Sequence, residues 1–507
     1  MTDKNQNICR VKNNSVISLN SIPVYSYADF SGLAVELLSK DDNHCVTYFA
    51  SPYKNDLRFI AAIADDTAGD IILLSYILTS SEPKQLNSLT PKITALHIFE
   101  REIFENYGIA FKDHPWLKPV RFPHDRFDRN MKVNDYPFYK INSHELHEVG
   151  VGPVHAGIIE PGHFRFICNG ENVLHLEIQL GWQHRGVEAL MLEKKQLLQR
   201  VILSESIAGD TAVGHSLAFT QLMEALGDIK INEQLMVERA IALELERLAI
   251  HVGDIAALCT DISYALGANI FAILRTGIIN FTQSWCGNRL GKGMIRPGGI
   301  NLPFTNEHKE RLFDVLSKFE FQFVELAHRT YKLSSVENRF DDIGTVNEEL
   351  IRKIGGVGMT ARMANVKRDI RSSHPFAGFI IFPIEPVTLP KGDVFSRFLL
   401  RRKEIKKSIA WIRNLLDNYS FDTPSKKPLN DIQLKPDSFA ISLTEGWRGE
   451  ICHCALTDET GNLIFYKIKD PSMHNWKALE LSLRNLEISD FPINNKSYNL
   501  SYCGYDL

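Results

Sequence analysis

The first part of the chain alternates short apolar runs with polar turns. Residues 44–53, 58–65 and 69–78 are apolar or alternate between apolar and polar, and short polar segments separate them. Such runs are typical of β-strands. Residues 93–108 then carry apolar positions at helical spacing and stop at a glycine, which predicts a helix. We expect this part to be a small α/β domain.

A stretch rich in proline and charge, residues 113–140, follows this domain. It is expected to be a linker or an extended arm, and we place the domain boundary at residue 130, between domains 1–130 and 131–507. Residues 152–186 then hold two alternating runs with the turn sequence Asn-Gly-Glu-Asn between them. This pattern predicts a β-hairpin or a small sheet.

From residue 187 to about 285 the pattern is almost entirely helical, because apolar residues recur at helical spacing and proline is absent. Further helices are predicted at 305–335, 345–355 and 394–418, and the chain then returns to β structure, with a hairpin turn at 458–462. The predicted fold class is α+β: a small N-terminal α/β domain followed by a mostly helical domain with peripheral β segments.

Two helical segments raise the question of a membrane. Residues 262–281 form the most apolar stretch, but Arg275 interrupts them, and we expect a buried helix. Spanning a bilayer takes about 18 or more apolar residues, so the chain is not expected to cross one. Segment 394–418 is basic. A solvated face is favoured there, and docking to an acidic partner or a membrane surface is the alternative.

Composition narrows the class of protein further. The chain has 507 residues, 44% of them hydrophobic and 23% charged, as in ordinary globular proteins, and its net charge of −4 argues against a general nucleic-acid binder. The N-terminus is polar and shows no signal peptide. The eight cysteines form no Cys-x-x-Cys pair. Cys452 and Cys454 fall on one side of an alternating strand, where a core role is favoured over metal binding. We therefore expect a reducing, cytoplasmic compartment.

Histidine, arginine and carboxylate residues gather beside glycines where the helical part turns. His155, Asp210 and His215 are examples, and Glu246 stands close to Arg247 in the same kind of setting. Such groups at loop–helix junctions are typical of a buried proton path or a polar cofactor pocket. Any one of them alone is better explained by capping or packing.

Several of these stretches resemble known families. Residues 100–115, EREIFENYGIAFKDHP, are similar to the signature of the 30-kDa subunit of respiratory complex I. Six later motifs occur in the order of the complex I 49-kDa-type subunit, and match better still the large subunits of membrane-bound, energy-converting group 4 nickel–iron hydrogenases of the formate hydrogenlyase and hydrogenase-4 type. These motifs are GPVHAGIIEPGHFRF, QHRGVEAL, GDTAVGHSLAF, ERLAIHVGD, NRLGKGMIRPGG and KRDIRSSHP.

The chain departs from the hydrogenase pattern at the metal ligands. Those enzymes hold nickel and iron with two Cys-x-x-Cys motifs. Here Ala208 and Thr211 stand at the first pair of positions, and Ser472 and Asn475 at the second. These side chains cannot replace bridging thiolates. Neither a nickel–iron centre nor hydrogenase activity is therefore expected, and no bound metal or covalently held cofactor is predicted.

The resemblance also implies roles for other residues. His155 matches the histidine that binds the quinone head group in complex I, whereas the tyrosine that binds it falls on Gly209. Asp210, Thr211 and His474 are candidates for holding a quinone differently. Glu188 matches a proton-transferring acid, and with Asp210 and His215 it forms the expected catalytic set. The expected polar wall of the cavity consists of Arg362, Asp369 and Arg371.

The resemblance implies an oxidoreductase subunit of the NADH-quinone oxidoreductase kind, active only within a complex. It would take electrons from an iron–sulfur small subunit to a quinone or another small acceptor and couple this to ion translocation. Its other expected partners are a ferredoxin-like subunit and antiporter-like membrane subunits, on the cytoplasmic face of the inner membrane. The alternative is a non-catalytic structural or coupling subunit. The electron donor, the final acceptor and the ion stay open.

Overall fold

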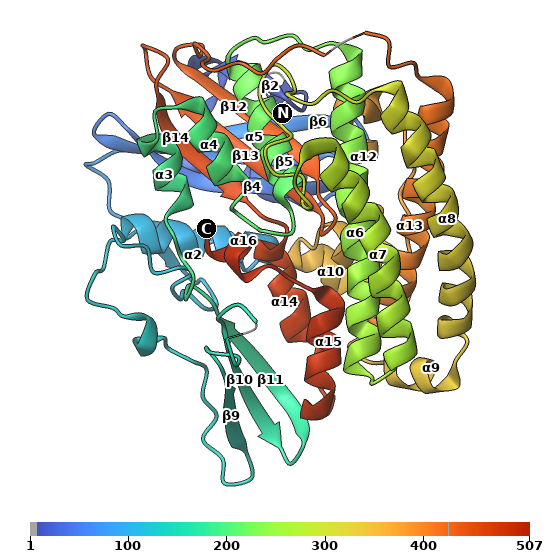
Figure 1. The fold of residues 1–507 in the computed structure, drawn as a ribbon. Coiled ribbons are helices and arrows are strands. Elements are labelled where there is room, and N and C mark those ends of the chain that lie inside the picture. The colour runs from blue at the N-terminus through green and yellow to red at the C-terminus, as the bar shows by residue number, and fades with distance from the viewer. Residues whose placement is uncertain (1–7, 158, 424) are drawn as a thin grey trace.

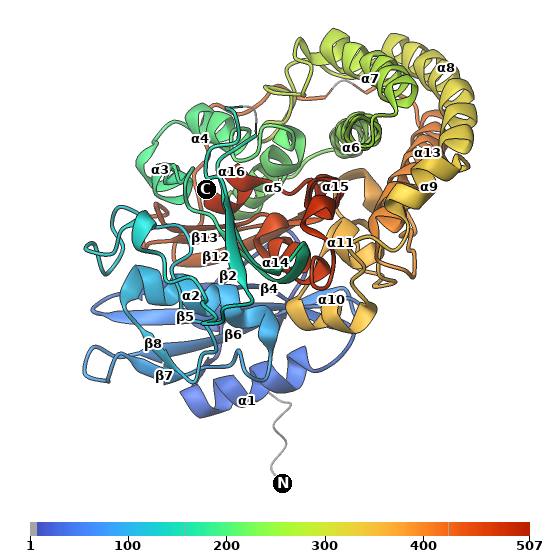
Figure 2. The same cartoon turned by 90° about the horizontal axis from the view of Figure 1, so that it is seen from below.

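The computed structural model describes residues 8–157, 159–423 and 425–507. Long helices stand side by side on one flank, sheets occupy the other, and a small sheet of strands β9, β10 and β11 projects from the base (Figure 1). Seen from below, the N-terminal sheet and the helices lie at opposite ends, with the C-terminal segments between them (Figure 2). The mixed architecture confirms the predicted α+β class.

The N-terminal sheet has the strand order β1-β6-β5-β4, and β3 pairs with β6 in parallel. The three apolar runs expected to be strands are its three long members. Phe59, Ile60 and Leu73 on these strands are fully buried, which explains why the runs are apolar throughout. The strands and the helix beside them are β1 (Cys9–Val11), β3 (Val24–Tyr25), α1 (Tyr27–Leu38), β4 (Asn43–Tyr53), β5 (Asp56–Asp65) and β6 (Asp70–Leu78).

The predicted helix at 93–108 is α2 (His97–Tyr107), preceded by one turn of 3-10 helix, η3 (Thr94–Leu96). Gly108 ends it with a φ of 70°, and a Cβ at this position would lie 2.5 Å from the Phe127 ring. Glycine is therefore needed for both conformation and space. A short parallel pair, β7 (Gln85–Asn87) and β8 (Ala110–Lys112), flanks the helix.

The proline-rich stretch forms an extended arm, as expected, with one 3-10 turn at η4 (Val133–Asp135). Arg121 fixes the arm to both ends of the molecule: it pairs with Glu102 on α2, and its Nε donates to the carbonyl of Tyr505 at 2.6 Å. The arm leads into an antiparallel sheet of order β11-β10-β9. In it the Asn-Gly-Glu-Asn turn joins β10 to β11, as predicted. These strands are β9 (His147–Val151), β10 (His163–Asn169) and β11 (Asn172–Gln179).

A four-stranded sheet, of order β14-β13-β12-β2, contains strands from both ends of the sequence. β2 comes from the N-terminal segment and pairs antiparallel with β12. The N-terminal part thus supplies a strand to a C-terminal sheet, and the expected boundary at residue 130 stays a prediction. The members of this sheet are β2 (Ser15–Ser18), β12 (Ser438–Glu445), β13 (Glu450–Thr457) and β14 (Leu463–Lys469).

Strand β13 also carries the one close cysteine pair. Cys452 and Cys454 are both buried, with their sulfurs 3.5 Å apart, and both belong to the hydrophobic core. This fits the core role that the alternating pattern favoured. His453 points to the other face of the strand, where it bonds to His215.

The helical flank consists of α6 (Glu233–Asp261), α7 (Ala265–Cys286), α8 (Asn306–Tyr331) and α13 (Val394–Asn418). Side-chain caps fix three of their starts: Asn232 on α6, Thr305 on α8 and Asp393 on α13 each accept a hydrogen bond from a backbone amide of the first turn.

The expectation of a buried helix at 262–281 is wrong for one face of α7. Phe271, Ile278 and Phe281 are buried against the neighbouring helices, but Ile273 is 68% exposed. Within the described residues, α7 is the one helix that is long and apolar enough to cross a membrane; core helices of soluble proteins also meet this criterion.

The basic helix α13 is not simply a solvated face. Arg401 is fully buried, and its Nε donates to Asp254 on α6 at 2.8 Å. Lys403 and Lys406 do point to solvent. The basic residues of α13 therefore have two roles: Arg401 forms a buried ion pair with α6, and Lys403 and Lys406 are solvated.

Two segments matter for the site: residues 206–211 (the first loop) and residues 470–475, which include the first turn of α14 (the second loop). The remaining helical segments complete the fold. They are α3 (Val187–Glu193), α4 (Leu197–Ser204), α5 (Ala212–Leu226), α9 (Ser334–Phe340), α10 (Glu348–Ile354), α11 (Gly358–Arg362), α12 (Ile370–Ser373), η5 (Ala377–Ile380), α14 (Ser472–Ser482), η6 (Ile488–Asp490), α15 (Phe491–Tyr498) and α16 (Tyr502–Asp506). Residues 502–507 are buried, and the carboxylate of Asp506 accepts hydrogen bonds from the amides of Gly181 and Gln183. This C-terminal segment is ordered structure.

Candidate functional site

The first loop leads directly into α5. Ala208 and Thr211 are buried, whereas the side chain of Asp210 is 37% exposed. The loop therefore presents the charged Asp210 to solvent next to the exposed Gly209, and buries Ile207, Ala208 and Thr211. Helix α5 has no side-chain cap of its own. Its first free amides, those of Val213 and Gly214, instead donate to the carboxylate of Glu246 on α6, at 2.7 and 3.1 Å.

Arg448 joins this loop to the C-terminal part. Its two terminal nitrogens each lie 2.6 Å from a carboxylate oxygen of Asp210, and one also donates to the Thr211 hydroxyl at 3.1 Å. Its Nε donates to the carbonyl of Asn499 at 2.6 Å. The guanidinium lies 3.9 Å from the ring of Trp447. Burial opposes the charge, but Asp210 more than compensates and keeps the pKa of Arg448 above its usual value. The arginine is a fixed cation between the two parts.

His215 connects the two loops. Its Nε2 lies 3.0 Å from the carboxylate of Asp470 in the second loop, and its Nδ1 lies 3.2 Å from Nε2 of His453. The other nitrogen of His453 lies 2.7 Å from the hydroxyl of Tyr466. All four side chains are buried. They form an unbroken line of hydrogen-bonding groups through which a proton can be exchanged.

The neighbours in this line set its protonation. Burial lowers the pKa of His453 well below its ordinary value, and the adjacent His215 adds to the effect, so His453 is neutral near pH 7. Burial alone would raise the pKa of Asp470, but its interactions with His215 outweigh burial and lower the pKa. Asp470 is therefore the anionic end of the line, and His215 is the group that faces it.

The four positions where the hydrogenase resemblance places cysteines are occupied differently. The hydroxyl of Ser472 accepts from the amide of Ser501, and the side chain of Asn475 bonds to the backbone N–H and carbonyl of Val357. Ala208 has no donor atom, and Thr211 faces the Arg448 cation. A set without thiolates and with a guanidinium beside it does not fit a nickel–iron centre.

Another acidic cluster, Asp341, Asp342 and Asp393, is geometrically close enough to hold a cation. However, Lys391 already lies within 3.3 Å of all three carboxylates. The cluster is neutralised in part by its own lysine.

Glu246 is the titratable group nearest to the amides at the start of α5. Burial raises its pKa to about 8; the two amide hydrogen bonds offset part of the rise, and the charge of Asp210 adds to it. Beside it, Arg289 and Leu290 help to line a cavity of about 10 Å³, close to the volume that one water molecule needs. Glu246 can thus hold or release a proton near neutral pH.

The expected quinone ligand His155 lies elsewhere, in the loop between β9 and β10. Its Nε2 lies 2.8 Å from the carbonyl of Gly162, and its ring centroid is 5.7 Å from that of Phe164. It is partly exposed. Among the described residues no hydrogen bond or ion pair joins His155 to Asp210, Thr211 or His215, so whether they act together stays a prediction.

Two further candidates, Glu188 and His474, have partners outside the first loop. Glu188 accepts from the amide of Ile468 and pairs with Lys467 at 3.1 Å, next to Glu102 of the N-terminal part. His474 faces the carbonyl of Ala95, at 3.1 Å, and burial lowers its pKa to about 3. Both side chains are thus engaged by groups other than Asp210 and Thr211, and their expected roles stay predictions.

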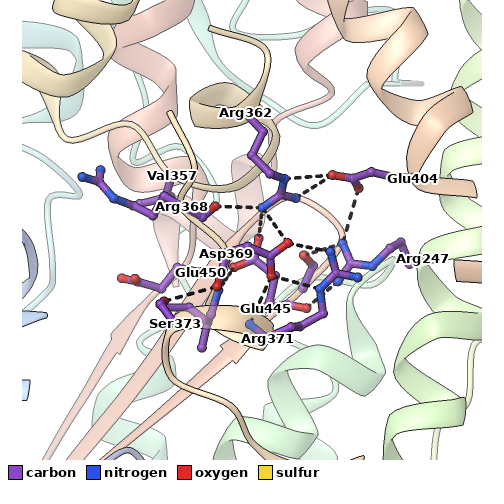
Figure 3. Close-up of polar contacts among 12 residues, drawn as sticks. Arg247, Val357, Arg362, Arg368, Asp369, Arg371, Ser373, Glu404, Glu445 and Glu450 are labelled. Atoms are coloured by element: carbon purple, nitrogen blue, oxygen red, sulfur yellow. Dashed lines mark hydrogen bonds and ion pairs between the residues drawn. The ribbon is translucent and has the colours of Figure 1, made fainter. Parts of the chain in front are cut away.

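The expected polar wall is a sealed network of charges, drawn in Figure 3. Arg362 faces Glu404, Glu445 and Asp369, at 2.8, 2.7 and 3.3 Å. Asp369 also pairs with Arg371 at 2.6 Å. These side chains are at most 4% exposed. The buried network is completed by Arg247, Glu244 and His251.

This buried network holds three guanidiniums and four carboxylates. Burial raises the pKa of Glu445, and the nearby charge of Asp369 adds to the rise. Glu445 is therefore the carboxyl that most readily holds a proton, and this proton would offset the excess of carboxylates over guanidiniums.

Sequence reasoning grouped Glu246 with Arg247 and missed that they serve different sites. Successive helical residues point about 100° apart, so Glu246 faces α5 while Arg247 enters the buried network. Arg448 and Asp470 were also missed as site residues. The available signal was their position, within Glu-Gly-Trp-Arg-Gly-Glu and directly before the second pair of replaced cysteines.

Two family models match the chain. The model described as respiratory-chain NADH dehydrogenase, 30 Kd subunit, covers residues 28–140, and that described as the 49 Kd subunit covers residues 267–435. The chain therefore carries a complex I 30-kDa-type domain and a 49-kDa-type domain fused in one polypeptide. It is a complex I-related oxidoreductase subunit by family.

Individual relatives refine this class. The chain is 25% identical to hydrogenase-4 component G of Escherichia coli (strain K12), over 94% of this chain and 85% of the relative. It is 27% identical to formate hydrogenlyase subunit 5 of the same organism, over 80% and 74%. It is also 22% identical to the C/D subunit of the NADH-quinone oxidoreductase of Phocaeicola vulgatus (strain ATCC 8482 / DSM 1447 / JCM 5826 / CCUG 4940 / NBRC 14291 / NCTC 11154), over 86% and 89%.

A solved structure shows the same fold. A chain of the membrane-bound sulfane sulfur reductase, an archaeal respiratory membrane complex, superposes with a TM-score of 0.67 at 20% identity, covering 73% of this chain and 100% of that one. The relatives thus include a hydrogenase component, a formate hydrogenlyase subunit and a C/D subunit of an NADH-quinone oxidoreductase, and the solved structure is that of a membrane-bound complex.

Proposed function

We propose that this chain is an electron-transferring subunit of a membrane-associated, complex I-like oxidoreductase, and that it serves the proton-coupled reduction of a quinone or another small acceptor. The observation that carries the proposal is the line from Asp470 through His215 and His453 to Tyr466, which begins between the two loops. A site that reduces a quinone needs protons as well as electrons, and these residues can supply them.

The proposed division of labour follows the geometry. Electrons would come from an iron–sulfur cluster in a small partner subunit, because the cysteines of this chain form no Cys-x-x-Cys pair. The acceptor takes two electrons and two protons to become a quinol. Asp210 and Arg448 would orient its polar group at the exposed side of the first loop, and Glu246, with a pKa of about 8, would exchange protons nearby. Ion translocation would take place in antiporter-like membrane subunits.

The same proposal includes the absence of hydrogen turnover. The donor atoms at the four former ligand positions are engaged by the protein itself, apart from Ala208, which has none. Stoichiometric nickel in the purified complex, with hydrogen-dependent reduction of a dye, would show that this part is wrong.

The experiment for the acceptor is binding of a quinone analogue to the purified complex. Replacement of His215 by Gln breaks the line at its centre, so we expect acceptor reduction to fall at least tenfold while electron entry into the iron–sulfur partner is retained. His155→Ala tests whether the loop between β9 and β10 binds the quinone. Its control is His147→Ala, because the side chain of His147 is exposed. Unchanged acceptor reduction in both His215→Gln and His155→Ala would rule out the proposed site.

A second candidate function is a non-catalytic coupling subunit. The observation in its favour is Arg448, which ties the first loop to the C-terminal segment at Asn499 with four hydrogen bonds. In that case His215→Gln would leave electron transfer intact but uncouple it from ion movement. Parallel measurement of both rates in the reconstituted complex separates the two functions.

A further inference from the structure

A second cavity lies between the N-terminal part, the arm and α14, and its lining includes none of the residues of the line from Asp470 to Tyr466. Its volume is about 740 Å³, within the range of about 300–1,000 Å³ that is usual for small-molecule sites. Helix α2 forms one wall, the strand β11 another, and α14 a third. Nothing in the proposed function uses this space.

The first observation that points to a ligand is an unpartnered histidine. His97 lines the cavity and is 4% exposed, yet neither ring nitrogen has a hydrogen-bond partner among the described residues. Buried polar atoms are almost always bonded, because a buried group without a partner loses its hydrogen bonds to water and gains none in the protein. A ligand that bonds to His97 would make up for this loss.

The second observation is an arginine without a carboxylate. Arg101 also lines the cavity and is 8% exposed. Its Nε and Nη2 donate to the carbonyls of Lys118 and Pro119 and to the hydroxyl of Tyr136, whereas Nη1 has no acceptor in the described part of the chain. No carboxylate lies within ion-pair distance of it there. A buried guanidinium with free donors is a site for an anion.

The third observation is the balance of charge around the cavity. Its lining includes five cations and two carboxylates, and each carboxylate already pairs with a lysine: Lys118 with Glu177, and Lys477 with Glu480. Lys353 and Arg484 are exposed and have no side-chain partner among the described residues. Together with Arg101 they leave an excess of positive charge facing the cavity.

Aromatic rings complete the lining. Trp116 lies 5.1 Å from the ring of His97, centroid to centroid, and Lys477 lies 4.8 Å above the Trp116 ring. Tyr136 and Tyr139 lie on the same arm segment. Such rings stack with planar groups, while the cations hold an anionic one.

We propose that this cavity binds a small organic anion that carries a planar ring, of about the size of a mononucleotide. Arg101, Lys353 and Arg484 would hold its anionic group, His97 would donate or accept one hydrogen bond, and Trp116 would stack on its ring. The site is formed jointly by the 30-kDa-type part, the strand β11 and the C-terminal helix α14.

The test is calorimetric titration of the full-length protein with three probes at low salt: ADP, adenosine and inorganic phosphate. We expect saturable binding of ADP, and binding at least about tenfold weaker for each of the other two, a difference of about 1.4 kcal/mol. If adenosine binds as tightly as ADP, the site does not require an anionic group. If phosphate binds as tightly as ADP, the site does not require a planar ring. No saturable binding of ADP below about 1 mM would overturn the proposal altogether.

His97→Phe is the sharpest variant. Because the ring nitrogens of His97 have no protein partner, their removal should leave the thermal midpoint unchanged or raise it, while ADP binding weakens about tenfold. Lys353→Ala combined with Arg484→Ala should weaken ADP binding without unfolding, since both side chains are exposed. Lys403→Ala, an exposed lysine on α13, is the matched control. ADP binding that is indifferent to these substitutions would contradict the assignment of the cavity.

Discussion

Two of the arginine–carboxylate groups in the molecule, those around Arg362 and Arg448, lie in different surroundings. In the buried network, Arg362 meets three carboxylates and no side chain is more than 4% exposed. In the first loop, Arg448 meets a single carboxylate, Asp210, which is 37% exposed. The same kind of ion pair thus serves two purposes. The buried pairs of Arg362 hold helices and sheet together, whereas the partly exposed Arg448–Asp210 pair is accessible to a substrate.

The largest loss of stability should come from a substitution in the buried network around Arg362. Arg362→Met leaves Glu404, Glu445 and Asp369 buried without their common cation, which should cost about 3–5 kcal/mol in the free energy of unfolding. Denaturant unfolding monitored by far-UV circular dichroism measures it. Lys403→Ala should change stability by less than about 0.5 kcal/mol. A loss below about 1 kcal/mol for Arg362→Met would show that water compensates the network.

Arg448→Met should have a smaller effect on stability. It removes hydrogen bonds to Asp210, Thr211 and the carbonyl of Asn499, and bonds of charged groups contribute about 1.5–3 kcal/mol. Because this arginine links the two parts, amide hydrogen exchange should rise in residues 206–211 and in Asn499. Equal protection in variant and parent would mean that the loops do not depend on Arg448.

Glu246→Gln should change the pH dependence. A folded-state pKa of about 8, above the ordinary 4.5, means that the folded chain holds this proton more tightly than the unfolded chain. That contribution to stability is fully present below about pH 4.5 and is lost as the pH rises through about 8. The parent should therefore lose more stability than Glu246→Gln between pH 5 and pH 8.5 in thermal melts. Parallel profiles for the two proteins would disprove the raised pKa.

The smallest stability effect is expected for Asp210→Asn. The side chain is partly solvated and Asn keeps one acceptor for Arg448, so the loss should stay under about 1 kcal/mol. Acceptor reduction by the assembled complex should nevertheless fall clearly, because the orienting charge is gone. If stability and activity fall together in proportion, the loop pair is structural like the buried network.

Local sequence patterns predicted much of the fold because they reflect local physics. The apolar runs at 44–53, 58–65 and 69–78 became the long strands of the first sheet, and the glycine after α2 ended it as expected. Pairing between distant segments was not visible. Nothing in Ser15–Ser18 indicates that this strand joins β12, more than 400 residues away.

The site was predictable in part. The two loops were found through the positions of the missing cysteines, but their contents depend on side-chain directions that spacing does not fix. His474 stands within the second loop, yet it faces the carbonyl of Ala95, because its place on α14 turns it toward the N-terminal part. Arg448 was overlooked because its partners Asp210 and Asn499 are distant in sequence.

Helix α14 has one feature with a wider consequence. Ser472 accepts a hydrogen bond from the amide of Ser501 and Asn475 from that of Val357, whereas Met473 and Trp476 line the second cavity. One helix therefore runs from next to Asp470, at the proposed acceptor site, to the second cavity. An occupant of either site that prefers one position of this helix changes the affinity of the other site, and thermodynamics requires the reverse influence to be equally large.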